Sequence, residues 1–442
     1  MSAPSLPSDR YANYVLGTMF VLTALNVMDR QVLAVLVEPV KNEFGLSDAE
    51  MGLLTGSAFA LAHVVAMVPV GRLADVGHRR NVIAIGLFLW SALTVLTGAS
   101  RVYWHLFLTR VGVGASETVG SGPAQSLLSD YFSVARRGMA LSVHASGGTF
   151  GAMAGFALGG LLADAVGWRL TFVCFGVPGL LLTLLLLLTV REPARGAVDG
   201  LSESVDASSA GGEGANAGER GSEDDSSLWT VLRYLLGLRT YRQLLIAGAL
   251  NAFANWSLLA WATAAMMRGH ALSATEAGAR IASSVTLFSA AGLIVAGLLS
   301  DRLGRTDIRW YMWLPAVASL LAYPFLLAFL LLPDPDFAFW VVIPGAFFNT
   351  MWVGTFNASI QLLARPRMRA TANSFFVLLT TGLIGQGLGP VFVGVLSDWL
   401  EPAYGVDALR YALAVAVATS VWAALHSVLG TRTLRQERAS PG

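Results

Sequence analysis

The chain has 442 residues, of which 55% are hydrophobic and only 13% are charged, and its mean hydropathy is +0.61. A water-soluble core of this length does not need so much apolar surface, so the composition indicates an integral membrane protein. The formal net charge of +1, with arginines placed singly in loops and not gathered into a basic patch, argues against a nucleic-acid partner.

The first apolar run, at about 14–37, contains the segment Asn26-Val27-Met28-Asp29-Arg30. The core of a signal peptide has no such charges, so we expect no cleaved signal. At membrane depth each charge costs roughly 2.5–3.5 kcal/mol on insertion scales, and such residues normally face a polar interior. Asp29 and Arg30 therefore indicate a substrate or proton path.

The rest of the chain contains further apolar runs of spanning length. With about 20 apolar residues per crossing, the sequence predicts twelve spans. They are 14–37, 50–71, 81–99, 104–126, 139–163, 168–190, 240–266, 280–299, 309–332, 338–362, 370–396 and 405–429. Because the count is even, both termini are predicted to lie on the same side.

One long segment separates the sixth span from the seventh. Residues 191–227 are rich in Gly, Ser, Ala and acidic residues and nearly devoid of aromatic ones. Such a composition cannot bury enough surface to become ordered. We therefore predict an N-terminal six-helix bundle at 1–190, a disordered cytoplasmic linker at 191–227, and a C-terminal six-helix bundle with a cytoplasmic tail at 228–442.

Loop charges predict the orientation. Arginines gather in the loops on one side, whereas acidic residues dominate the opposite loops. By the positive-inside rule, both termini and the linker are predicted to be cytoplasmic. A near-absence of lysine beside many arginines is typical of a GC-rich bacterial genome, so we expect the bacterial inner membrane.

The two halves of the chain show signs of an internal repeat. Spans five and eleven align at a constant offset of 234 residues. The matching pairs are Gly148 with Gly382, Gly151 with Gly385, Gly155 with Gly389, Gly160 with Gly394, and Asp164 with Asp398. Glycine is common in membrane helices, but that does not explain the shared spacing. The glycine ladders fit close helix packing and a moving gate equally well.

Parallel six-span repeats joined by a cytoplasmic linker are typical of major facilitator transporters, whose substrate site lies near the midplane. The segment Gly297-x-Leu-x-Asp301-Arg302-x-Gly304-Arg305 resembles the signature of that superfamily. The first-half copy, Gly71-x-Leu-x-Asp75-Val76-Gly77-His78-Arg79-Arg80, departs from it at Val76 and His78, where Arg and Gly are usual. This resemblance covers nearly the whole chain.

A narrower resemblance rests on the first half. Asn26-x-x-Asp29-Arg30, together with Arg110 followed seven residues later by Glu117, resembles the Spinster family of lysolipid and sphingosine-phosphate transporters. That resemblance implies an amphiphilic substrate with an anionic head. The residues alone indicate only a ligand that is anionic and partly apolar.

Charged residues at the arginine-rich ends of spans two and eight are predicted to form a cytoplasmic gate. Acids there can pair with arginines or cap helix N-termini. The superfamily resemblance implies a latch that is made in the outward-facing state and released in the inward-facing state. The alternative to a latch is that these charges only anchor the helix ends at the membrane interface. The predicted gate residues are Asp75, Arg79, Arg80, Arg136, Asp301, Arg302 and Arg305.

The four central charges need partners on other helices. Arg110 and Glu117 share a face of the fourth span but lie about 10.5 Å apart along its axis, and the neighbours Asp29 and Arg30 point about 100° apart. Pairing Asp29 with Arg110 and Arg30 with Glu117 gives four buried charges that sum to zero. An anionic head arriving at Arg30 would then deprive Glu117 of its counter-charge and favour proton uptake.

We therefore predict that Glu117 and Asp29 couple transport to protons, with Glu117 as the carrier and Asp29 as a structural partner. The alternative is a set of permanent salt bridges that fix helix register. Amides and tryptophans of the second half would complete the substrate site, or they would only form interhelical hydrogen bonds, worth about 0.6 kcal/mol each. The predicted substrate-binding residues are Asn26, Arg30, Arg110, Asn251, Asn255, Trp256, Asn349 and Trp352.

The sequence thus predicts an all-α membrane protein of twelve transmembrane helices in two pseudo-symmetric six-helix bundles, the major facilitator fold. We expect a proton-coupled secondary transporter that moves a lysophospholipid or sphingoid phosphate by alternating access. A transporter of small organic anions or drugs is the nearest alternative. A membrane-embedded lipid-modifying enzyme is more remote, because no Ser/His/Asp or metal-ligand spacing recurs. We expect no cofactor and no metal, a monomer, and membrane lipids as neighbours.

Overall fold

The structure, a computed structural model, describes residues 8–193, 195, 228–365 and 368–439. Within these ranges all regular secondary structure is helical. Nine helical stretches among the residues described, some of them made of successive helices, are long and apolar enough to cross a membrane. Most of the predicted linker, namely residue 194 and residues 196–227, lies outside the described residues.

The first half of the chain contains the elements of six predicted spans. They are α1 (Asp9–Val35), α2 (Val37–Phe44), α3 (Asp48–Thr55), α4 (Ser57–Val76), α5 (Arg79–Gly98), α6 (Tyr103–Ser116), η1 (Glu117–Gly120), α7 (Gly122–Ser129) and α8 (Val134–Thr189). In α8 the backbone of Gly167 has φ 80° and ψ 163°, which separates the fifth span from the sixth. Glycine adopts this left-handed conformation without a Cβ penalty.

The second half contains the other six. Its elements are α9 (Leu228–Gly237), α10 (Arg239–His270), α11 (Ala274–Arg280), η4 (Ile281–Thr286), α12 (Leu287–Gly304), α13 (Trp310–Leu331), α14 (Pro335–Asn349), α15 (Trp352–Leu363), α16 (Arg369–Val377), η6 (Leu378–Leu388), α17 (Gly389–Tyr404), η7 (Gly405–Asp407) and α18 (Ala408–Ala439). Here η4 and η6 are π-helical. Such segments are rare and often lie at functional sites.

The twelve predicted spans are all helical, which confirms the predicted all-α class. Two of the nine stretches, Val134–Thr189 and Arg369–Glu437, hold two predicted spans each. The fourth predicted span, which comprises α6, η1 and α7, is not among the nine.

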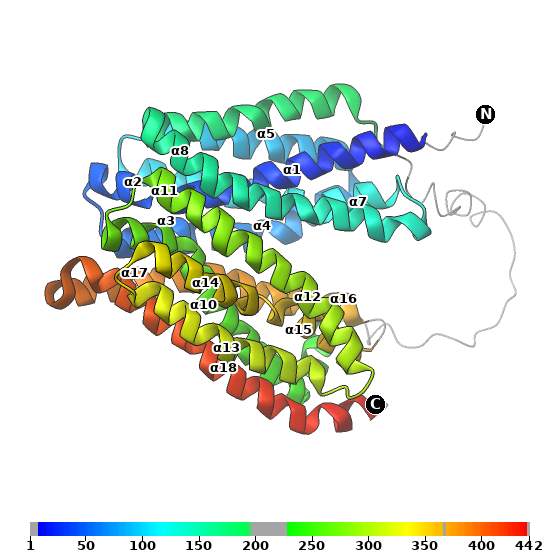
Figure 1. Cartoon of the computed structure of the whole chain (residues 1–442). Coiled ribbons are helices and arrows are strands. Elements are labelled where there is room, and N and C mark those ends of the chain that lie inside the picture. The colour runs from blue at the N-terminus through cyan, green and yellow to red at the C-terminus, as the bar shows by residue number, and fades with distance from the viewer. Residues whose placement is uncertain (1–7, 194, 196–227, 366–367, 440–442) are drawn as a thin grey trace, which may run out of the picture. The chain divides into compact units, whose positions relative to one another are not determined.

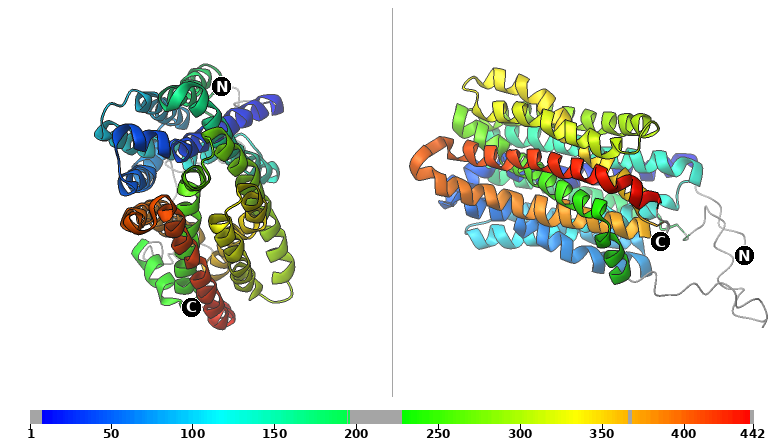
Figure 2. Two further views of the ribbon diagram at one scale, coloured as in Figure 1. Left: turned by 60° about the vertical axis from the view of Figure 1, so that its left-hand side comes forward. Right: turned by 90° about the horizontal axis from the view of Figure 1, so that it is seen from below.

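The chain divides into two compact units. Unit 1 comprises Met1–Val32, Ala62–Gly155 and Val166–Arg220, and unit 2 comprises Leu33–Leu61, Phe156–Ala165 and Gly221–Gly442. In unit 1, α5 packs against α6. In unit 2, α10 runs alongside α18, and α13 packs on both α14 and α18 (Figures 1 and 2). The domain boundaries at residues 190 and 228 stay a prediction.

The glycine ladder of the fifth span serves close packing within unit 1. A Cβ atom on Gly151 would collide with the backbone carbonyl oxygen of Ala24 in α1. One on Gly148 would meet only side-chain methyl groups, those of Val27 at 3.5 Å and Thr23 at 3.9 Å. The equivalent Gly385 lies against Ala252 and Trp256 of α10 in unit 2. Close packing is thus present at both glycines, and a moving gate stays a prediction.

This contrast gives a first prediction. We expect Gly151→Ala to lower the free energy of unfolding by about 1–3 kcal/mol, because two backbones must separate. Gly148→Ala, its control on the same ladder, should change it by less than about 0.5 kcal/mol. Thermal unfolding of the two variants in detergent measures the difference. Equal losses in both variants would contradict the packing explanation.

Candidate functional site

Four charged side chains from α1, α6 and η1 lie together within unit 1. Asp29 and Arg30 stand near the end of α1, Arg110 lies on α6, and Glu117 begins η1. The side chains of Asp29, Arg110 and Glu117 are at most 4% exposed, whereas that of Arg30 is 20% exposed. Arg30 is thus the most exposed member of this group.

The four charges form two pairs. The Arg30 Nε donates to Glu117 Oε2 at 2.6 Å, and Arg110 Nη1 lies 3.9 Å from Asp29 Oδ2. This is the cross-pairing predicted from helix geometry, and it is confirmed. The first pair is a short, charge-assisted hydrogen bond, while the second is a looser electrostatic contact.

Two uncharged side chains hold the pairs in place. The Thr94 hydroxyl in α5 donates to Asp29 Oδ2 at 2.9 Å. Asn26, one turn before Arg30, accepts from Arg30 Nη2 at 3.2 Å, and its own amide donates to the backbone oxygen of Glu117 at 3.4 Å. Sequence reasoning found Asn26 but missed Thr94, because a lone threonine in an apolar span carries no pattern.

Several polar atoms of this cluster have hydrogen-bonding capacity to spare. Within the described part of the chain, Asp29 Oδ1, Glu117 Oε1, and Arg110 Nε and Nη1 are buried without a hydrogen-bond partner. Leaving such a group unpaired costs about 1–3 kcal/mol, so the arrangement is not the one that stability alone favours. Glu117 Oε1 is thus a buried acceptor that no donor in the described residues satisfies.

The backbone at Glu117 leaves the α-helical path. The α6 helix ends at Ser116, η1 is a 3₁₀ turn, and Ser121 has φ −103° and ψ −91°. Pro123 lacks an N–H group, which is tolerated in the first turn of a helix, and α7 starts anew at Gly122. Short 3₁₀ stretches inside a helix often mark a hinge. The segment Gly120-Ser121-Gly122-Pro123 carried this signal in the sequence.

The predicted polar residues of the second half lie in unit 2 and are only partly brought together. Asn349 in α14 donates to Asn255 in α10 at 2.9 Å, but Asn251 accepts instead from Ser319 in α13, at 3.0 Å. Trp256 packs on Gly385. Among the residues described, Asn251 Nδ2 and Trp352 Nε1 are buried donors without an acceptor. An interhelical hydrogen bond thus accounts for Asn255 and Asn349, whereas Asn251 and Trp352 each retain an N–H donor without an acceptor.

The arginines of the predicted first-half gate bind acids other than Asp75. Buried Arg79 binds Asp130 at 2.5 Å and Glu192 at 2.8 Å, and the backbone N–H of Arg80 donates to the same Glu192. Arg136 pairs with Asp9 at 2.9 Å. Asp75 is exposed and makes no ion pair with any other residue the structure describes. A gating role for these residues stays a prediction.

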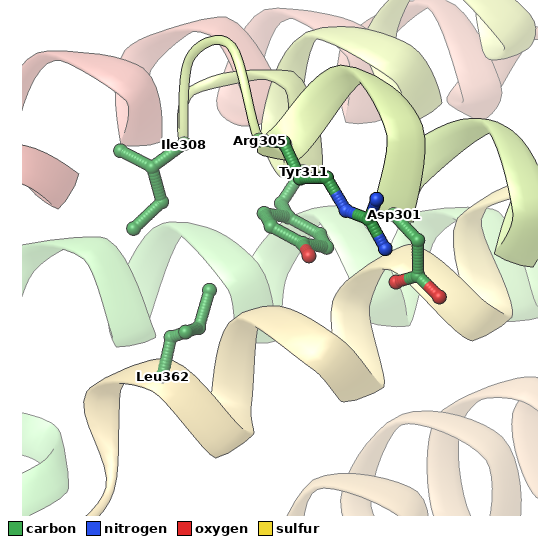
Figure 3. Close-up of a pocket in the computed structure, with 6 residues that line it drawn as sticks. Asp301, Arg305, Ile308, Tyr311 and Leu362 are labelled. Atoms are coloured by element: carbon green, nitrogen blue, oxygen red, sulfur yellow. The ribbon is translucent and has the colours of Figure 1, made fainter.

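The second-half gate residues border a shallow pocket in unit 2. Asp301, Arg305 and Tyr311 line this cavity of 270 Å³, and Figure 3 shows the Arg305 side chain pointing toward the Asp301 carboxylate. Arg302 is exposed beside them. The acid that binds arginines in this region is Asp307, which sequence reasoning missed. Hydrogen bonds from Arg309, and a further one from Arg435, lower the pKa of Asp307 to about 2.

A second buried ionic cluster, in unit 2, was also missed. Asp48 at the start of α3 accepts from Lys41 at 2.6 Å, from both terminal nitrogens of Arg268 at 2.7 and 2.6 Å, and from Ser397 at 2.6 Å. Arg268 also binds Glu38 at 2.6 Å. In the sequence these acids appear only as loop charges, because nothing there reveals which helices meet.

A repeated helix cap accompanies this cluster. Asp398 accepts from the backbone N–H groups of Asp48 and Ala49 at 2.9 and 2.8 Å, at the first turn of α3. Its repeat equivalent, Asp164, accepts from the N–H of Thr275 at 2.7 Å, at the first turn of α11. A carboxylate at a helix N-terminus is favourable. The same arrangement occurring twice supports the repeat predicted from sequence.

Comparisons with known proteins agree with this architecture. A family model described as Major Facilitator Superfamily matches residues 19–390. A Mycolicibacterium smegmatis protein described as an MFS-type efflux pump is 30% identical over 428 residues, which cover 95% of this chain and 94% of that protein. Protein spinster homolog 1 of Bos taurus is 26% identical over 416 residues, covering 89% and 74%.

A solved structure is similar over almost the whole chain. It is the crystal structure of a bacterial homolog to the human lysosomal transporter Spinster, in an inward-facing and unoccupied conformation. The TM-score is 0.85 at 29% identity, with 99% of this chain and 100% of that chain covered. The two resemblances stated from the sequence are thereby confirmed.

Proposed function

Because the chain belongs to the Major Facilitator Superfamily, we propose that it is a proton-coupled secondary transporter that moves an anionic amphiphile by alternating access. The family and the fold are those of a transporter, so the lipid-modifying enzyme is set aside. A lysophospholipid or a sphingoid phosphate is the proposed substrate, and its class comes from the Spinster resemblance.

The Arg30–Glu117 pair carries the proposal. Arg30 is partly exposed, whereas Glu117 is fully enclosed and relies on Arg30 for its 2.6 Å hydrogen bond. A phosphate head that binds the Arg30 guanidinium competes directly with the Glu117 carboxylate, since guanidinium suits both groups. Glu117 then loses its counter-charge in a low-dielectric site and takes up a proton, which keeps the buried charge balanced.

The other pair plays a different part. Asp29 is held by Thr94 at 2.9 Å and by Arg110, and both side chains of that ion pair are enclosed. A ligand therefore reaches Arg30 before Arg110. We assign Asp29 and Arg110 to fixing α1 against α5 and α6, while Glu117 exchanges the proton. A part for Asn251, Asn255, Trp256, Asn349 and Trp352 in the substrate site stays a prediction.

The relative described as an efflux pump favours a second candidate, a proton-coupled transporter of small organic anions or drugs. The same Arg30–Glu117 exchange serves an organic carboxylate as well as a phosphate. We further propose the bacterial inner membrane as the location, with both termini cytoplasmic, and a monomeric protein.

A ligand panel tests the substrate class. Lysolipids, sphingoid phosphates, organic anions and sugars are added to the detergent-solubilised protein, and thermal unfolding is followed. A ligand at 100 times its Kd should stabilise the protein by about 2.7 kcal/mol. Stabilisation by organic anions but not by lysolipids would favour the second candidate, and stabilisation by sugars alone would contradict both.

Replacing Arg30 tests the site itself. We expect Arg30→Gln to remove the stabilisation by anionic lysolipid, because the side chain that receives the head has lost its charge. Arg101→Gln, which changes an exposed arginine in a loop, should leave it intact. Isothermal titration of both variants with the best ligand of the panel measures the effect. Unchanged affinity in Arg30→Gln would contradict the assignment.

A further inference from the structure

A groove in unit 2 belongs to none of the sites described above. Its volume is 540 Å³, and it runs between two helical passes. One wall comes from the end of α11, from η4 and from the start of α12, and the other comes from α14, which packs on η4 and α12 (Figure 1). Both walls belong to stretches long and apolar enough to cross a membrane.

The groove is charged at one end and apolar along its length. Arg280 and Asp336 form an ion pair of 2.5 Å and so mark the same end. From there one wall continues to Phe288, about 12 Å further along the helix, and the other continues to Ile343, about 10.5 Å further. A ligand that fits must therefore have a charged head and an apolar chain.

The two charges at the mouth are held in place but remain available. The Arg280 guanidinium lies 5.4 Å from the centre of the buried Phe339 ring, a cation–π contact that orients it. The Asp336 side chain is 75% exposed. An ion pair this exposed contributes little to stability, so a ligand that supplies both opposite charges can replace it at small cost.

The π-helical segment adds acceptors to the same groove, one turn from Arg280. Ser284 Oγ donates to the backbone oxygen of Arg280 at 2.6 Å, and Ser283 Oγ donates to that of Ala279 at 2.9 Å. Each hydroxyl has used its hydrogen in this way, so its oxygen remains only as an acceptor. With the Asp336 carboxylate, these oxygens suit an ammonium group, while Arg280 suits a phosphate.

We propose that this groove binds a zwitterionic phospholipid of the surrounding membrane, with its phosphate on Arg280, its ammonium on Asp336 and one chain along Phe288 and Ile343. A soluble zwitterion would leave the apolar length of the groove and the 73% exposed Trp340 without a partner. An anionic lipid would leave Asp336 without a cation. The site shares no residue with the Arg30–Glu117 pair and does not rest on the proposed function.

Photolabelling tests the proposal on the full-length protein in detergent. The probe is lysophosphatidylethanolamine with a diazirine in its chain, and digestion followed by mass spectrometry locates the label. We expect labelling of the peptide that contains Trp340 and Ile343. Unlabelled lysophosphatidylethanolamine should compete at least tenfold better than lysophosphatidylglycerol, which has the phosphate but no ammonium.

Matched variants separate this site from the central one. Ser283→Trp fills the mouth from an exposed position and should reduce the α14 label at least tenfold, whereas Leu287→Trp, also exposed and outside the groove, should not. Arg30→Gln should abolish labelling of α1 and α6 only. A label on α14 that survives Ser283→Trp would overturn the site, and equal competition by the two headgroups would overturn the zwitterionic ligand.

Discussion

Replacing Glu117 by glutamine is expected to abolish uphill transport in proteoliposomes with an imposed pH gradient. Glutamine keeps the size of the side chain and an oxygen that can accept from Arg30, but it cannot bind and release a proton. Without coupling, no gradient remains to drive accumulation, so the ratio of internal to external substrate should fall to roughly one. Exchange of labelled for unlabelled substrate at equal pH should persist.

The control for this experiment is Asp29→Asn. This carboxylate is held by Thr94 and lies by Arg110, so removing its charge leaves Arg110 buried without a counter-ion. We expect a loss of about 3–5 kcal/mol in stability, together with a retained response to the pH gradient in the protein that folds. Full pH dependence in Glu117→Gln, with none in Asp29→Asn, would reverse the two assignments.

Asp48→Asn should cause one of the largest losses of stability in the molecule. Asp48 is 2% exposed and accepts from Lys41, Arg268 and Ser397. The asparagine keeps the shape but leaves two cations facing a single acid, Glu38. Breaking a buried pair in this way costs about 3–5 kcal/mol, which unfolding in detergent at neutral pH would reveal.

Glu38→Gln is the matched control, because Glu38 binds the same arginine. Burial raises the pKa of Glu38 above its usual value, in spite of the opposing effect of Arg268. A carboxyl whose pKa is raised on folding binds its proton more tightly in the native state, so its ionisation costs stability as pH rises through the folded pKa. Glu38→Gln should therefore change stability little at neutral pH. A loss as large as that of Asp48→Asn would contradict this ranking.

The features that could be predicted from the sequence are those that depend on a local pattern or on charge balance. Apolar run lengths predicted the membrane passes. The requirement that Asp29, Arg30, Arg110 and Glu117 neutralise one another predicted their pairing, which the N···O distances of 2.6 and 3.9 Å confirm. The glycine offset gave the repeat. In each case the deciding information lay in the pattern of one span, in a match between two spans, or in a sum of charges.

What the sequence could not supply depends on which helices meet. Thr94 is indistinguishable from other threonines until α5 packs beside α1, and Asp48 resembles a loop acid until Arg268 and Ser397 reach it. The predicted gate groups Asp75 with Arg79, whereas Arg79 forms ion pairs with Asp130 and Glu192. Such choices among many possible partners are made by tertiary packing.

The position of Glu117 at the junction of α6 and η1 has one more consequence. A carboxylate in the middle of a regular helix is attached to a stiff backbone, so a change in its charge would move its side chain and not the helix. Here the regular helix has already ended, and the backbone dihedrals of Ser121 are neither helical nor extended. If Glu117 takes up a proton as proposed, the change of charge occurs where the backbone has already left the regular helix, so it can be converted into a rotation of the segment beyond.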